Sequence, residues 1–347
     1  MKPPGHPLLS VPLRIMARAY GAVMGARNRY YDRPAAIRHA PVPVFSVGNL
    51  TVGGTGKTPL VAWLAGQLLA LGRRPAVVSR GYGGTAGRGP CVVSRGQGPL
   101  CSADVCGDEP YLLARSLAMV SVVVGADRWA GATAAAGAGA DVVILDDGFQ
   151  HRRLARDLDL VLLDARDPFG GFQLLPAGTL REPIRGLARA DLALVTRSRP
   201  DQTHEAIESE VRRHNPHAPI LRAGHRRVGF FDSAGRTAER PRNAVVFCGI
   251  GNPRSFRDDL EAENVRIAAF EASRDHHRYD AAEVRRLRSL AASLNAVPVT
   301  TEKDLVRLPE EALAGDGPPI VALRIETEVF DPEPLIAAIR DVLDRGK

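Results

Sequence analysis

The chain has 347 residues, 45% of them hydrophobic and 5% aromatic, and a net charge of +7, which allows one large or two modest domains around an aliphatic core. Seven Lys or Arg residues and one acidic residue lie within residues 1–40. A nucleic-acid enzyme would more often spread its basic charge over a binding surface, so we expect no nucleic-acid partner. The four cysteines form no C-x-x-C pair, which is typical of a reducing cytosol and argues against a disulfide framework.

Residues 1–40 are predicted to contain a basic amphipathic helix that starts near Pro12. Arg14 and Arg18 interrupt its apolar run, which is therefore too short to span a bilayer. An apolar face with nearby arginines suits a helix lying in a membrane surface, and packing against the chain's own core is the alternative. The apolar residues with the spacing of one helical face are Leu9, Leu13, Met16, Tyr20 and Val23.

A phosphate-binding loop is predicted between a strand at 42–48 and a helix at 59–70. In this context backbone N–H groups and the helix N-terminus bind phosphates. Lys57 would contact the β- and γ-phosphates, and the Thr58 hydroxyl would hold Mg²⁺. The first two positions depart from two common versions of the loop, so it predicts a nucleoside triphosphate without naming a subfamily. The loop residues are Thr51, Val52, Gly53, Gly54, Thr55, Gly56, Lys57 and Thr58.

The next strand, at 74–81, ends in a Gly-rich loop that contains Arg80 and Tyr82. Ligands bind at this edge of a parallel sheet. Residues 85–103 are expected to form a surface hairpin or loop, and the cysteines around it lack the spacing of common zinc sites. Asp108 and Glu109 then open a helix, where they either cap its N-terminus or take part in chemistry.

The apolar strand at 140–147 ends in Asp146 and Asp147, which is the Walker B pattern. A carboxylate at such a strand end, beside a phosphate-binding loop, can hold Mg²⁺ directly or through water. Gln150 and His151 follow at once. Further buried strands at 159–164 and 191–196 continue the alternation of strands and helices, which predicts an α/β fold with a mostly parallel sheet and helices on both faces.

The composition changes around residues 215–242, after which a second, smaller α/β unit is predicted. It has no phosphate-binding loop of its own, so we expect it to cover the site or hold substrate. In its loop at 275–279, a neutral histidine could act as a base or orient one, or could simply lie on the surface. The predicted units are an N-terminal segment, a P-loop kinase-like domain and a smaller C-terminal domain, at residues 1–40, 41–225 and 226–347.

Six motifs along the chain together resemble the tetraacyldisaccharide 4′-kinase family of the lipid A pathway in Gram-negative bacteria. The resemblance covers nearly the whole chain. It implies transfer of the γ-phosphate of ATP to the 4′-hydroxyl of a tetraacyldisaccharide 1-phosphate, giving lipid IVA. It also implies a monotopic enzyme on the cytoplasmic face of the inner membrane, and nothing in the sequence indicates an obligate protein partner. The motifs are 47–59, 79–83, 107–110, 146–152, 175–183 and 275–276.

The resemblance assigns roles to the matching positions. Asp108 would be the base for the sugar hydroxyl and His276 its partner, with His277 as the alternative partner. The nucleotide and metal side would use Lys57 for phosphate, and Thr58, Asp146 and Asp147 for Mg²⁺. The acceptor or nucleotide side would be lined by Arg80, Tyr82, Glu109, Gln150 and His151.

Two other functions have to be weighed against a kinase. A P-loop GTPase or ATPase switch, or a metallochaperone, would use hydrolysis to drive partner exchange, but the sequence contains no recognisable N-K-x-D guanine motif. A partitioning or scaffold ATPase would carry a lysine where this chain has Val52.

Overall fold

The structure is a computed structural model that describes residues 7–87, 89–313 and 317–345. In the predicted N-terminal segment, Lys2 and the side chain of Leu9 lie outside the part of the chain that the structure describes. The helices are α1 (Pro7–Tyr31), α2 (Lys57–Ala70), α3 (Ala103–Cys106), α4 (Asp108–Ser116), α5 (Arg128–Gly137), α6 (Glu205–His214), α7 (Pro253–Ala262), α8 (Ala281–Ser293), α9 (Glu302–Leu305), α10 (Glu310–Leu313) and α11 (Glu333–Arg345), with 3₁₀ turns η1 (Pro34–Ala36), η2 (Gly170–Phe172) and η3 (Ile184–Arg189).

One large sheet organises the described chain. Its strands are β1 (Val44–Asn49), β2 (Pro75–Ser79), β3 (Cys91–Arg95), β4 (Ser121–Val124), β5 (Val142–Asp146), β6 (Leu158–Asp164), β7 (Leu192–Thr196), β8 (Ile220–Asp232), β9 (Thr237–Ala238), β10 (Asn243–Cys248), β11 (Arg266–Ala272), β12 (Val297–Thr301) and β13 (Val321–Phe330). Their order is β11-β10-β12-β13-β8-β7-β6-β1-β5-β2-β4-β3, with β9 beside β8. Three pairs are antiparallel, β3–β4, β8–β9 and β8–β13, and the others are parallel. The predicted α/β class with a mostly parallel sheet is confirmed.

Helices cover both faces of the sheet around β1. Residues of this strand alternate between two core clusters, because successive side chains of a strand point to opposite faces. Phe45 and Val47 pack in the cluster that contains α2, α4 and α11. Val44 packs in the cluster that contains α5. We call the part built on β1–β7, with α11, the P-loop part.

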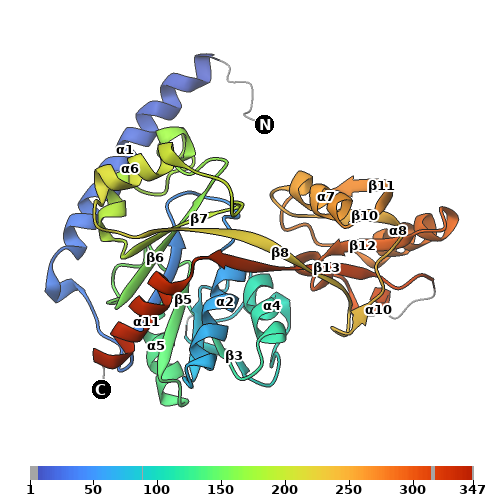
Figure 1. The fold of residues 1–347 in the computed structure, drawn as a ribbon, viewed down its shortest axis with the longest axis horizontal. Helices are drawn as coiled ribbons and strands as arrows, with labels where there is room; N and C mark the ends of the chain where they lie inside the picture. Colours follow the sequence, from blue (N-terminus) through green and yellow to red (C-terminus); the bar gives the residue numbers. More distant parts are fainter. Residues whose placement is uncertain (1–6, 88, 314–316, 346–347) are drawn as a thin grey trace.

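A smaller part comprises β10, β11 and β12 with helices α7 to α10. It has separate core clusters on the two faces of β10. Two long antiparallel strands, β8 and β13, run between this part and the P-loop part (Figure 1); we call them the arm. The sequence showed only a composition break at 215–242, because β8 has consecutive exposed residues at 226–228 and lacks the pattern of a buried strand.

The last helix, α11, packs against the P-loop part and not against the smaller part. Its apolar side chains, among them Leu335 and Ile339, are buried in the same cluster as Leu64 and Leu68 of α2. In Figure 1 this helix lies beside β5 and β6, away from the smaller part. The chain therefore crosses to the smaller part along β8 and returns along β13.

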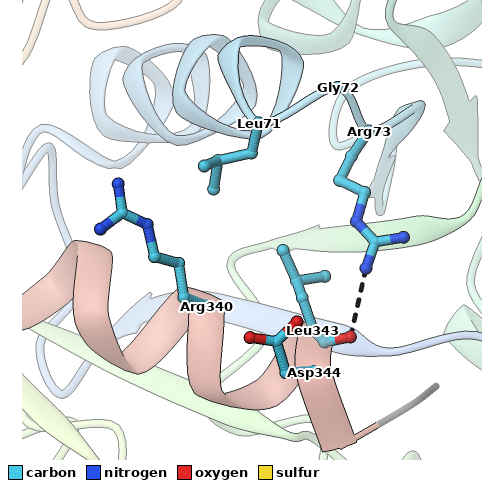
Figure 2. Close-up of a pocket in the computed structure, with 6 residues that line it drawn as sticks. All are labelled: Leu71, Gly72, Arg73, Arg340, Leu343 and Asp344. Atoms are coloured by element: carbon cyan, nitrogen blue, oxygen red, sulfur yellow. Dashed lines mark hydrogen bonds between the residues drawn. The ribbon is translucent and has the colours of Figure 1, made fainter.

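A cavity of about 310 Å³ lies between the end of α2 and α11 (Figure 2). Arg73 points across it and donates to the carbonyl of Leu343 over 3.2 Å, while Arg340 faces it from α11. This cavity adjoins the C-terminal end of α2, a helix of 14 residues and therefore about 20 Å long. It is remote from the predicted phosphate-binding loop, which lies at the other end of the helix.

Helix α1 begins at Pro7, so Pro12 lies inside the helix and the expected start near Pro12 is wrong. Its buried side chains are Ala17 and Met24, whereas Ile15 and Val23 are more than 60% exposed. Most of the predicted apolar face is therefore not the face that packs on the protein. Among the residues described, no helix is both long and apolar enough to cross a membrane.

Candidate functional site

The predicted phosphate-binding loop connects the end of β1 to the start of α2. Gly53 and Gly56 have φ angles of 122° and 84°, which side chains of other residues rarely allow. The N–H of Val52 donates to the carbonyl of Thr179 over 2.8 Å. These features close the loop over the N-terminus of α2, where phosphate-binding loops place their ligand.

Contacts from the end of β7 support the outer side of the loop. The Thr196 hydroxyl donates to the carbonyl of Thr55 over 3.0 Å, and Arg197 Nη2 donates to the carbonyl of Gly54 over 2.7 Å. Because these bonds use carbonyl oxygens, they do not compete with a phosphate for the N–H groups of the loop.

Lys57 lies among polar groups at the ends of β1 and β5. Its Nζ is 3.2 Å from Asn49 Oδ1 and 3.5 Å from Asp147 Oδ1. Arg181 Nη1 contacts both oxygens of Asp147, at 2.9 and 2.7 Å. Burial raises the pKa of Asp147, but Lys57 and Arg181 outweigh it and hold the pKa below its usual value. Asp147 is therefore ionised beside the loop.

Asp146 is buried more deeply than Asp147. Its Oδ2 accepts a hydrogen bond from the Ser79 hydroxyl at 3.1 Å, whereas its buried Oδ1 has no hydrogen-bond partner among the described residues. Burial raises the pKa of Asp146 to about 6. The charge of Lys57 opposes this increase, and the charge of Asp147 adds to it. An unpartnered carboxylate oxygen beside a second carboxylate fits a magnesium ion, which prefers such oxygens.

The predicted catalytic pair is assembled from both parts of the molecule. Asp108 opens α4 in the P-loop part, and His276 lies in the loop after β11 in the smaller part. His276 Nδ1 is 3.2 Å from Asp108 Oδ2. His277 instead contacts Glu283, with 2.9 Å between Nε2 and Oε2. The structure thus brings His276, and not His277, to Asp108.

Two cations that the sequence reasoning did not single out also contact this pair. Arg307 Nε lies 2.7 Å from Asp108 Oδ2, and Lys303 Nζ lies 2.7 Å from Glu109 Oε1. Both follow β12. The run of polar residues at 300–304, at the end of this strand, was the only local pattern that could have indicated them. Arg181 likewise lies within the motif at 175–183, but only the fold shows that it contacts Asp147.

The remaining predicted site residues differ in their exposure to solvent. Arg80 and Tyr82 are exposed and line a cavity of about 290 Å³ beside the end of β2. Gln150 Nε2 donates to the carbonyl of Asn49 over 2.8 Å, so its side chain bridges inward to β1. Burial, with the charge of Arg128, lowers the pKa of His151 to about 4, and this histidine is neutral at physiological pH.

The cysteines near 85–106 do not resemble a zinc site. Cys91, Cys101 and Cys106 are free thiols. Burial, with a hydrogen bond to Cys101, raises the pKa of Cys106 to about 12. Among the described residues, these three thiols do not lie close enough together to hold a metal ion.

Comparisons with known proteins agree with this arrangement. A family model described as tetraacyldisaccharide-1-P 4′-kinase matches residues 9–344. A tetraacyldisaccharide 4′-kinase of Geobacter sulfurreducens is 41% identical over 97% of this chain and 94% of its own length. One from Anaeromyxobacter sp. is 42% identical over 99% of this chain and 94% of its own length.

A solved structure extends the similarity to the fold. The crystal structure of LpxK from Aquifex aeolicus in complex with ATP is 32% identical, with a TM-score of 0.79, and the match covers 96% of this chain and 99% of that one. The family model and both relatives span nearly the whole sequence, including the two parts that contribute Asp108 and His276. The chain belongs to the tetraacyldisaccharide-1-P 4′-kinase family.

Proposed function

We infer that this chain is a tetraacyldisaccharide 4′-kinase, which carries out ATP-dependent 4′-phosphorylation in lipid A biosynthesis. Family membership supports the activity. Within the structure, the observation that carries it is the contact between Asp108 and His276 beside the phosphate-binding loop. Glu109, next to Asp108, is close enough to Asp146 for its charge to raise the pKa of that carboxyl. A base for a sugar hydroxyl and a nucleotide site thus adjoin.

The loop at 51–58 binds the phosphates of ATP in this proposal, and the ATP complex named for the LpxK structure supports it. Lys57 contacts the β- and γ-phosphates. Thr58, Asp146 and Asp147 would hold Mg²⁺, which would neutralise phosphate charge. The unpartnered Oδ1 of Asp146 supports the metal assignment.

Asp108 acts as the base in the transfer step. Its carboxylate accepts the proton of the 4′-hydroxyl as that oxygen bonds to the γ-phosphorus, and the bond from this phosphorus to the β-phosphate oxygen breaks. His276 holds the Asp108 carboxylate in place. Most of the acceleration in such transfers comes from positioning and charge neutralisation. The acceptor or nucleotide side of the site is lined by Arg80, Tyr82, Glu109, Gln150 and His151.

Helix α1 attaches the enzyme peripherally to the cytoplasmic face of the inner membrane. Val11, Ile15 and Val23 expose apolar side chains that a lipid surface would cover, and the exposed Arg14 and Arg18 suit anionic headgroups. The acceptor is itself a lipid, so this attachment places the enzyme where its substrate lies.

The three predicted units keep separate tasks in this proposal. Residues 1–40 bind the membrane, residues 41–225 bind the nucleotide, and residues 226–347 cover the site and supply His276. Within the last unit, α11 packs on the P-loop part. The smaller part, which covers the site, is therefore joined to the P-loop part through both strands of the arm, β8 and β13. Such a cover would couple closure to catalysis.

Transfer to a lipid acceptor can be compared with bare hydrolysis to test this function. Purified full-length protein is incubated with γ-labelled ATP and Mg²⁺, with and without tetraacyldisaccharide 1-phosphate in detergent. With the acceptor present, we expect label in the lipid fraction. Without it, we expect little release of free phosphate. Equal phosphate release in both reactions with no labelled lipid would instead favour the switch or metallochaperone class.

A further inference from the structure

We propose that Lys303 and Arg307 form a cation clamp that positions the Asp108–His276 pair from the smaller part: Arg307 fixes one oxygen of Asp108, and Lys303 fixes the tautomer of His276. The proposal deepens the kinase assignment and rests on it for its catalytic consequence. The contacts of Lys303 and Arg307 with the pair can be tested without turnover.

Arg307 is itself rigidly held. Its side chain is only 2% exposed. Its Nη1 donates to the carbonyl of Gly249 and to Asp304 Oδ1, both at 2.9 Å. Asp304 is fully buried and accepts a hydrogen bond from the Thr301 hydroxyl at 2.7 Å. Its Nη2 lies 3.1 Å from His276 Nδ1. A guanidinium fixed in this way presents its Nε donor at a defined place, because its five N–H groups form a planar fork.

That donor contacts the same oxygen of Asp108 that His276 contacts. Arg307 Nε and His276 Nδ1 lie 2.7 and 3.2 Å from Oδ2. Among the described residues, the hydrogen bonds of this carboxylate all go to Oδ2. Oδ1 is therefore the oxygen left to accept the proton of a substrate hydroxyl. A hydroxyl that bonds to Oδ1 would not compete with Arg307 or His276 for the same oxygen.

Lys303 determines which nitrogen of His276 carries the proton. Its Nζ lies 3.3 Å from His276 Nε2 and 2.7 Å from Glu109 Oε1. An ammonium group can only donate, so Nε2 must accept. The proton of a neutral ring is then on Nδ1, where it donates to Asp108 Oδ2. Nδ1 also lies 3.1 Å from Arg307 Nη2, which can only donate. A proton on Nδ1 suits the contacts to Lys303 and Asp108, whereas a proton on Nε2 would suit only the contact to Arg307.

The charges around Asp108 agree with the clamp. Burial raises its pKa, but Arg307, followed by His276, outweighs burial and holds the pKa below its usual value. The charged or titratable groups that face it from the packed elements are Arg307, His276, Lys303, Glu109, Arg278 and Asp104. Asp108, Glu109 and His276 lie close enough together to hold a metal ion. Lys303 and Arg307 already neutralise the two carboxylates, and we therefore assign cations of the protein to this cluster.

Variants of the full-length protein test the clamp. Arg307→Met should lower kcat about 10- to 100-fold, the effect of a misplaced reacting group, while the KM for ATP changes less than about threefold. The acid limb of the pH profile of kcat/KM should move to higher pH, since Asp108 loses its main stabilising charge. Arg307→Lys keeps the charge without the fork, so it should restore most of the pH profile but only part of kcat.

Nuclear magnetic resonance gives a readout that does not require turnover. In the wild type, the imidazole nitrogen shifts of His276 should report a proton on Nδ1, and in Lys303→Met the two tautomers should mix. The carboxyl shift of Asp108 should titrate at higher pH in Arg307→Met. Arg278→Met is the matched control, because Arg278 also pairs across the two parts, with Asp104, but makes no hydrogen bond to Asp108 or His276.

The outcomes separate the two proposals. Unchanged Asp108 titration in Arg307→Met, an unchanged His276 tautomer in Lys303→Met, or equal losses in Arg278→Met would overturn the clamp. A wild-type protein that shows the expected resonances but phosphorylates no lipid would overturn the kinase assignment and leave the geometry of the clamp supported. Thermal melting of each variant identifies loss of fold, and Arg307→Lys serves as the second variant if Arg307→Met does not fold.

Discussion

The two halves of the site are built in different ways. The nucleotide half takes its groups from the ends of β1, β5 and β7, which all lie in one sheet within the P-loop part. The catalytic half joins Asp108 and His276, which are 168 positions apart and belong to different parts. The first half thus lies within one part of the molecule, whereas the second exists only while the two parts are in contact. ATP binding and catalysis should therefore respond separately to substitution.

The largest expected effect tests this separation directly. Asp108→Asn removes the base and should lower kcat about 10²- to 10⁴-fold, the usual contribution of general base catalysis. The Kd for ATP should stay within about threefold of wild type in a fluorescent-nucleotide titration, because the phosphate loop does not contain Asp108. Asp104→Asn, on the preceding turn, is the control and should retain activity. Weakened ATP binding in Asp108→Asn would contradict the independence of the two halves.

The second prediction distinguishes the adjacent histidines. His276→Asn should lower kcat about 10- to 100-fold, whereas His277→Asn, which loses a contact to Glu283, should change it less than about threefold. Asp108 works as a base only above its pKa. Burial raises that pKa, while Arg307 and, to a smaller extent, His276 lower it. Loss of His276 should therefore move the acid limb of kcat/KM to higher pH, by less than loss of Arg307 does.

A comparable loss in His277→Asn would show that the contact seen between His276 and Asp108 is not the working arrangement. So would an acid limb that stays in place in His276→Asn.

The third prediction concerns the nucleotide half. A Cβ at Gly48, in β1, would lie 2.5 Å from Phe149 Cβ and 2.6 Å from its backbone nitrogen, so one of them has to shift. Gly48→Ala should lower the free energy of unfolding by about 1–3 kcal/mol through overpacking and weaken ATP binding. Gly66→Ala, in α2 with open space around it, should instead raise stability by about 0.5–1 kcal/mol. Chemical denaturation of both variants measures the difference.

The same contrast explains what the sequence could predict. The phosphate loop and the acids after β5 are contiguous motifs flanked by buried strands, and local pattern was enough to find them. Lys303 and Arg307 were not found, because their importance depends on a contact between parts that no local pattern encodes. The arm was missed for a related reason. β8 is exposed where it leaves the core, so it has no continuous apolar run.

The smallest expected effect concerns α1, whose two faces belong to different environments. The inner face contacts the nucleotide half, since the Tyr20 hydroxyl donates to the carbonyl of Arg181 over 2.6 Å and Arg27 donates to the carbonyl of Gln150 over 2.7 Å. Ile15 and Val23 are on the exposed side. Deleting residues 1–25 would remove both faces, so single outward substitutions are the sharper test.

Ile15→Glu or Val23→Glu should weaken binding to anionic phospholipid vesicles about tenfold, because partial burial of one such side chain in lipid is worth about 1.5 kcal/mol. ATP binding should not change, since the inner face is intact. Ala22→Glu, also on an exposed position of α1, adds the same charge without removing a large apolar side chain and controls for charge repulsion. Equal sedimentation of all three variants with vesicles would mean that α1 meets the membrane by its charge, or not at all. Loss of ATP binding in Ile15→Glu would mean that the outer face also supports the nucleotide half, and the two regions would then be coupled through this helix.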